Sequence, residues 1–154
     1  KPVQARPPIL IGGGGPRVLS IAGREADIVG INGTMTAGVV GPDAIATMTA
    51  ASVDDKVGTV RRAAGERCDQ IEMNIRVFLM TFTDDRAGAM AAIGGAVGMD
   101  TSFVEQSPFA LIGTPEQMVA DLRARRDRWG FSYVIIGAEH VEAFAPVAAE
   151  LRGN

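Results

Sequence analysis

The stretch that decides the fold is Pro7–Pro16, which reads Pro-Pro-Ile-Leu-Ile-Gly-Gly-Gly-Gly-Pro. Its apolar run, Ile9–Ile11, is too short for a helix and lies between prolines and glycines, a pattern typical of a buried parallel strand. Pro16 suits the first position of a helix, because its missing N–H would have no intrahelical partner there. The stretch therefore predicts a strand, a glycine turn and a helix in direct succession.

Two interpretations of the glycine turn are open. Without Cβ atoms, Gly12, Gly13, Gly14 and Gly15 let main-chain N–H groups approach a ligand closely, and a turn that leads into a helix N-terminus favours an anion, usually a phosphate. The same residues suit a close strand–helix turn or a flexible linker equally well. The spacing does not match the dinucleotide-binding fingerprint, and a P-loop is excluded because no Gly-Lys-Ser or Gly-Lys-Thr follows.

Composition narrows the class of protein. The 154 residues are 47% hydrophobic with a formal net charge of -3, which is typical of one soluble globular domain spanning residues 1–154. The composition is not strongly basic, so no nucleic-acid partner is expected. The single Cys68 has no partner for an intramolecular disulfide and no metal-ligand companion, which favours a metal-free protein of the reducing cytoplasm. No apolar run approaches the roughly 20 residues of a membrane span, so no membrane association is expected.

The rest of the chain repeats the strand–helix pattern. Three further strand signals follow at Asp27–Ile31, Ile71–Phe82 and Phe131–Ile136. Helix signals follow each strand: residues 16–26, 52–64 with a capping-box start at Ser52, 86–97 after Thr83-Asp84-Asp85, 115–129 after Thr114 with Gln117 as its capping partner, and 141–151. Residues 98–112 are expected to be an irregular excursion with a short helix near Ser102–Glu105.

This order predicts the fold class. Four β/α units in succession indicate an α/β fold with parallel strands, right-handed crossovers and outer helices. Such units build either an open doubly wound sheet or one half of a (β/α)8 TIM barrel, and in both architectures ligands gather beyond the carboxyl ends of the strands.

Polar residues alternate along the longest strand signal. Glu72, Asn74 and Arg76 share one face of Ile71–Phe82, while Met73, Ile75 and Val77 share the other. This polar half is either a solvated strand end, a buried satisfied cluster, or part of a barrel interior near a cofactor.

At this point the residues resemble a known family, the luciferase-like flavin or deazaflavin oxidoreductases, in their carboxyl-terminal half. The resemblance is strongest to the actinobacterial branch that uses coenzyme F420. It rests on the order and spacing of Pro7–Gly15, Ala22–Asn32, Arg61–Gly65, Ser107–Pro108, Leu111–Gln117 and Gly130–Tyr133.

The resemblance implies the carboxyl-terminal half of a TIM barrel whose first four strands come from residues outside this sequence. In that family the glycine turn after the fifth strand contacts the phosphate-bearing tail of the cofactor, and this turn corresponds to Gly12, Gly13 and Gly14 here, with Gly15 included in the expected cofactor-binding site. The turn after the sixth strand, here Asn32-Gly33-Thr34, borders the same cavity. The family's principal acid/base residues lie in the absent half, so no catalytic residue is assigned here.

Three hypotheses about function follow from the resemblance. The first is an F420-dependent oxidoreductase that passes hydride between the deazaflavin and a small organic substrate. The second is an FMN-dependent luciferase-like monooxygenase, and the third is a non-catalytic half-barrel that only binds a partner or a phosphate. A parallel half-barrel leaves two sheet edges and an apolar concave face exposed, so we expect a complementary amino-terminal half or a second copy of the chain as partner.

Overall fold

The computed structural model describes residues 3–4, 6–35 and 41–153. Their main feature is a four-stranded parallel sheet with the order β1-β2-β3-β6. The spatial order of the strands follows their order in the sequence, so each new strand lies on the same side of the sheet as the one before, as in a barrel. In a doubly wound sheet the strand order instead reverses at one point. The predicted parallel α/β fold is confirmed, and the sheet stays open instead of closing into a barrel. The strands are β1 (Leu10–Gly13), β2 (Ile28–Ile31), β3 (Glu72–Arg76) and β6 (Phe131–Ile135).

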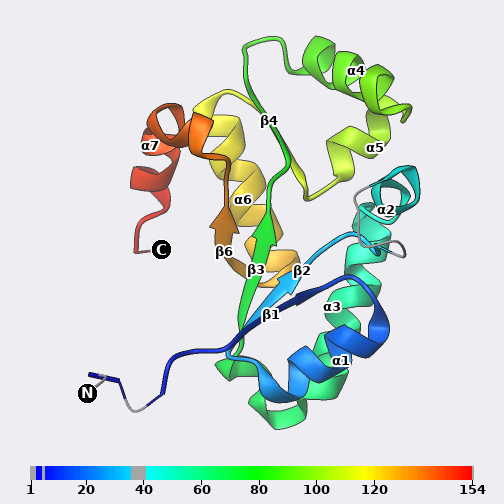
Figure 1. Ribbon diagram of the computed structural model, residues 1–154. Coiled ribbons are helices and arrows are strands. Elements are labelled where there is room, and N and C mark those ends of the chain that lie inside the picture. Colours follow the sequence, from blue (N-terminus) through cyan, green and yellow to red (C-terminus); the bar gives the residue numbers. More distant parts are fainter. Residues whose placement is uncertain (1–2, 5, 36–40, 154) are drawn as a thin grey trace.

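Helices cover one face of this sheet (Figure 1). Alternate strand residues point toward them, including Val29, Ile31 and Ile75, each at most 1% exposed. They join apolar side chains of the helices in one continuous core, which also contains Trp129 and Phe131. The covering helices are α1 (Pro16–Glu25), α3 (Ala50–Ala64), α6 (Pro115–Trp129) and α7 (Val141–Leu151).

The opposite face carries no helix within the part of the chain that the structure describes (Figure 1). Gly12, Gly30 and Asn74 lie together on it, because a Cβ on Gly30 would be 3.1 Å from Asn74 Oδ1 and 3.4 Å from Gly12 Cα. Asn74 is buried and its amide donates to the Tyr133 carbonyl at 2.9 Å. Leu10 is 47% exposed. Three interpretations of the polar face of this strand were open: a solvated strand end, a buried cluster with its hydrogen bonds made, and a barrel interior near a cofactor. Asn74 fits the second, because it is buried and hydrogen-bonded, whereas Glu72 and Arg76 are exposed.

The prediction of one strand over Ile71–Phe82 is wrong. The segment divides into β3 and β4 (Leu79–Phe82), which belong to different sheets. The division follows from a change of partner: Val77 N–H donates to Ile135 O, whereas Phe78 N–H and Leu79 N–H donate to Phe109 O. A continuous apolar run cannot reveal that its second half pairs with another strand.

The prediction of an irregular excursion over residues 98–112 is also wrong in part. Its last residues begin β5 (Ala110–Gly113), a fully buried strand that pairs in parallel with β4. Before it lies α5 (Thr101–Gln106), which Asp100 caps, close to the short helix expected at Ser102. With α4 (Arg86–Val97), these elements form an extension beyond the carboxyl end of β3 (Figure 1).

Helix starts follow the predicted chemistry with one correction. The capping box of Thr114 and Gln117 is confirmed at the start of α6, and Asp85 caps α4. Helix α3 begins at Ala50 instead of after Ser52, because the Thr49 hydroxyl accepts the N–H of Ser52 and is the true cap. The remaining short elements are α2 (Pro42–Ala46), η1 (Gly65–Gln70) and η2 (Ala138–His140).

Candidate functional site at the first strand–helix turn

The predicted glycine turn Gly12–Gly15 is shorter in the structure: Gly12 and Gly13 are the last residues of β1, and only Gly14 and Gly15 connect β1 to α1 at the carboxyl edge of the sheet. Gly15 occupies the N-cap position with extended dihedral angles, φ -90° and ψ 149°, and Pro16 follows as the first helical residue. Among the described side chains none caps this helix, and α2 and α7 also lack a capping side chain, whereas α3, α4, α5 and α6 each have one. The partial positive charge of the α1 N-terminus is thus left without a side-chain acceptor.

The second predicted turn lies directly against the first. Asn32 N–H donates to Gly13 O at 2.9 Å, and the Thr34 hydroxyl donates to Gly14 O at 3.0 Å. The structure therefore brings the residues of both predicted turns, Gly12–Gly15 and Asn32–Thr34, into one cluster. Whether the cluster holds a cofactor stays a prediction.

Glycine is required at three of these positions by the chain itself. A Cβ on Gly14 would overlap the Gly33 carbonyl group and lie 2.7 Å from Asn32 O. A Cβ on Gly33 would lie 2.7 Å from the Met48 methyl and 2.9 Å from Ala44 O, and one on Gly13 would lie 2.6 Å from Val18 Cγ1. These glycines permit close packing of one turn on the other.

Gly12 and Gly15 are different, because no packing contact requires them. A Cβ on Gly15 would meet nothing within 4 Å, and one on Gly12 would meet only Asn32 Nδ2 at 3.5 Å and Gly30 O at 3.8 Å. Gly15 therefore presents bare backbone to open space, and a side chain at the exposed Gly12 would have only ordinary van der Waals contacts. A ligand at this turn would contact Gly12 and Gly15, while Gly13, Gly14 and Gly33 shape the turn.

A hydrogen-bonded network supports the second turn from behind. Thr34 N–H donates to the Thr47 hydroxyl at 2.7 Å, and that hydroxyl donates to Ala44 O at 2.8 Å. The Lys56 ammonium donates to Thr47 O at 2.8 Å, and its side chain is buried. Lys56 thus holds Thr47, whose hydroxyl in turn accepts the Thr34 N–H. Burial lowers the pKa of Lys56 to about 8.

The depressed pKa of Lys56 predicts a rise in stability with pH. Between pH 8 and pH 10.5 the unfolded chain binds this proton and the folded protein does not, so the free energy of unfolding increases by about 3 kcal/mol across this window. Urea unfolding at pH 7.5, 9 and 10.5 measures it. In Lys56→Met the rise should be absent, and parallel pH profiles of the two proteins would contradict the assignment.

Cationic groups near this edge are exposed. Arg17 lies in the first turn of α1, and Arg76 ends β3 with its guanidinium 5.4 Å from the Phe78 ring centroid.

In the described ranges no group of three or more His, Cys, Asp or Glu side chains is arranged to hold a metal ion. The helices described there include none long and apolar enough to cross a bilayer.

Sequence reasoning missed the supporting network. Thr47 precedes α3 and Lys56 lies within it, and no sequence motif connects these two residues. The only local signal was the position of Lys56 beside Val57 on the face that also contains Val53 and Val60, which are buried. That pattern marks the lysine as inward-facing but not as a partner of Thr47.

Comparison with solved structures gives the class of fold. The chain is similar to the long-chain alkane monooxygenase LadA, with a TM-score of 0.60 and 17% identity over 95% of this chain. It is also similar to the coenzyme F420-dependent tetrahydromethanopterin reductase from Methanopyrus kandleri, with a TM-score of 0.55 and 16% identity over 86% of this chain. Both neighbours are oxidoreductases by name. No family model and no curated protein sequence matches the chain.

The chain spans less than half of either neighbour, 41% of the monooxygenase and 45% of the reductase. At this level of identity the likeness establishes the fold alone. Because the sheet is open and parallel, the fold is that of part of a barrel of the kind the two oxidoreductases contain, in agreement with the fold class predicted from the sequence.

Proposed function

We propose that this chain is the carboxyl-terminal half of a coenzyme F420-dependent oxidoreductase and that its β1–α1 turn binds the phosphate-bearing tail of the cofactor. The observation that carries the proposal is the uncapped N-terminus of α1, whose N-cap residue Gly15 faces open space, with the exposed Gly12 of β1 three residues before it. The resemblance of the sequence to the luciferase-like family and the F420-dependent structural neighbour support the choice of cofactor.

The residues present fit an anionic tail. An anion beside Gly15 would accept the first N–H groups of α1, the role that Thr or Asp side chains play at α3, α4, α5 and α6. Arg17 supplies a positive charge in the same helical turn. When bound, the deazaflavin supplies hydride chemistry, and this chain contributes binding and orientation of its tail.

A complementary half-barrel is the proposed partner. The exposed face of the sheet carries Leu10 and Tyr133, and Ile9 beside β1 is also exposed. Apolar surface at an open edge favours pairing with further strands. Since this chain spans less than half of either structural neighbour, 41% and 45%, four further β/α units are a more fitting partner than a second copy.

FMN is the alternative cofactor. The monooxygenase neighbour favours it, and a phosphate tail at the same turn serves either molecule. The two readings share the site proposed here and differ in the ring-binding residues, which the resemblance places in the other half.

Fluorescence titration of F420 and FMN tests the proposal, with the chain alone and mixed with its amino-terminal counterpart. We expect saturable F420 binding in the mixture. Preferential FMN binding would support the monooxygenase reading. If neither cofactor binds in either sample, the result would contradict the proposal and favour the non-catalytic half-barrel.

A further inference from the structure

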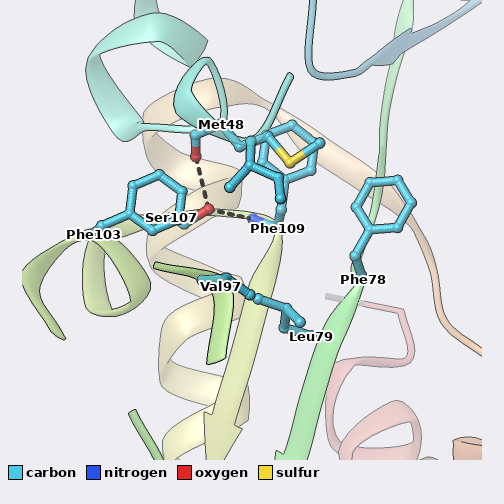
Figure 2. A pocket seen from close by; sticks show the side chains of 8 residues that line it. Met48, Phe78, Leu79, Val97, Phe103, Ser107 and Phe109 are labelled. Atoms are coloured by element: carbon cyan, nitrogen blue, oxygen red, sulfur yellow. Dashed lines mark hydrogen bonds between the residues drawn. The ribbon is translucent and has the colours of Figure 1, made fainter. Parts of the chain in front are cut away.

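A cavity of about 160 Å³ lies beyond the carboxyl end of β3, between the extension and α2. Folded interiors seldom contain voids larger than a water molecule, so a space of this size calls for an explanation. Figure 2 shows Phe78 and Phe103 on opposite sides of it in that view, with Met48 above and Val97 and Leu79 below.

The lining is almost entirely apolar. Ser107 is the one polar residue among those that line it, and its hydroxyl donates to Met48 O at 2.7 Å and accepts Phe109 N–H at 3.4 Å. That hydroxyl therefore has its partners within the protein. Water needs two to four polar partners to occupy a cavity, so this one favours an apolar occupant.

Access comes from the side of Phe78. This side chain is 42% exposed although it lines the cavity, and its ring stacks on Phe109 with centroids 6.0 Å apart. Phe78 directly follows Val77 at the switch from β3 to β4, so the opening faces the end of the sheet where parallel α/β folds bind ligands. A rotation of one aromatic side chain would widen the entrance.

From this geometry we infer that the cavity binds the apolar part of an organic substrate, a single six-membered ring or an alkyl segment of similar volume. The size matches a cavity of about 150 Å³ that stays dry and takes up benzene in another protein. The identification of the occupant as substrate rests on the proposed function, whereas binding of an apolar ring by the cavity does not.

The test uses the purified protein in its native oligomeric state, without any cofactor. Fluorobenzene is the probe. Methyl-¹³C methionine labelling places a reporter on Met48, and Met118, buried against α7 and β5, serves as the internal reference. We expect a saturable shift of the Met48 methyl signal and none for Met118. Pyrazine, a ring of the same size with two nitrogen atoms that lose their water, should bind at least roughly tenfold more weakly.

Two variants that fill the cavity from different segments decide the location. Val97→Phe and Ile45→Phe should each weaken fluorobenzene binding at least tenfold, whereas Val141→Phe, at a position 57% exposed and away from the cavity, should not change it. Binding unchanged in a folded Val97→Phe or Ile45→Phe protein, or no saturable shift in the unaltered protein, would overturn the inference. The F420 titration is independent: if F420 fails to bind while fluorobenzene binds at Met48, the proposed function falls and the cavity assignment stands.

Discussion

Replacing Arg125 with methionine is expected to lower the free energy of unfolding by about 3 kcal/mol. Arg125 is only 8% exposed, and its guanidinium donates to Pro108 O at 3.0 Å and to Ala110 O at 2.5 Å. It thereby ties α6 to the segment that enters β5. Burial lowers the pKa of Arg125 to about 10, which leaves the group charged at neutral pH, with the Asp121 carboxylate 4.0 Å away. Methionine fills similar space but leaves both carbonyl oxygens without their donor.

Arg123→Met is the matched control on the same helix. Its guanidinium is half-exposed and pairs with the exposed Glu150 carboxylate at 2.9 Å, so its loss should cost no more than about 1 kcal/mol. Urea unfolding at pH 7 measures both variants. Equal destabilisation by the two substitutions would show that the carbonyl contacts of Arg125 do not hold the extension in place.

The second large effect is expected from Gly14→Ala, which should destabilise the protein by about 3 kcal/mol or more. The new methyl group would overlap the Gly33 carbonyl group, and both sides of this collision are backbone. Relief requires the two turns to separate, which would break the hydrogen bonds from Asn32 to Gly13 and from Thr34 to Gly14.

Gly12→Ala, two residues earlier, is the comparison. Its methyl group has only ordinary contacts at 3.5 Å and beyond, so stability should change by less than about 0.5 kcal/mol. Thermal unfolding of both variants separates the two roles of the glycine run. A Gly14→Ala protein as stable as Gly12→Ala would contradict the close packing of the two turns.

Local patterns predicted much of the fold because they have local causes. Pro16 as the first helical residue and the Thr114 capping box depend only on neighbours in sequence, and both predictions are confirmed. The run Ile9–Ile11 predicts a buried strand, and this is wrong in part: the strand starts at Leu10, and Ile9 and Leu10 are 48% and 47% exposed because one face of the sheet carries no helix among the described residues. The switch at Val77 was not predictable in this way. It depends on Phe109, which is 31 residues away from Phe78 and offers a carbonyl to the second half of an otherwise continuous strand pattern.

The candidate site was predictable to a similar extent. Both turns were found from glycines and polar residues after short apolar runs, because parallel strands place their carboxyl ends at one edge. The sequence does not reveal which glycine faces open space, because Gly14 and Gly15 differ only in what the second turn brings near them. The cavity was hidden for the same reason: Met48, Phe78, Val97 and Phe109 come from four separate segments.

The most direct test of the proposed function compares Gly15→Asp with Gly15→Asn in an F420 titration of the assembled protein. Either side chain can cap α1 without meeting a neighbour, so both variants should be at least as stable as the unaltered protein. Only aspartate places a negative charge where the cofactor's tail is proposed to lie. We predict that Gly15→Asp weakens F420 binding roughly tenfold or more relative to Gly15→Asn. Equal affinity in the two variants would contradict the claim that this turn holds the cofactor.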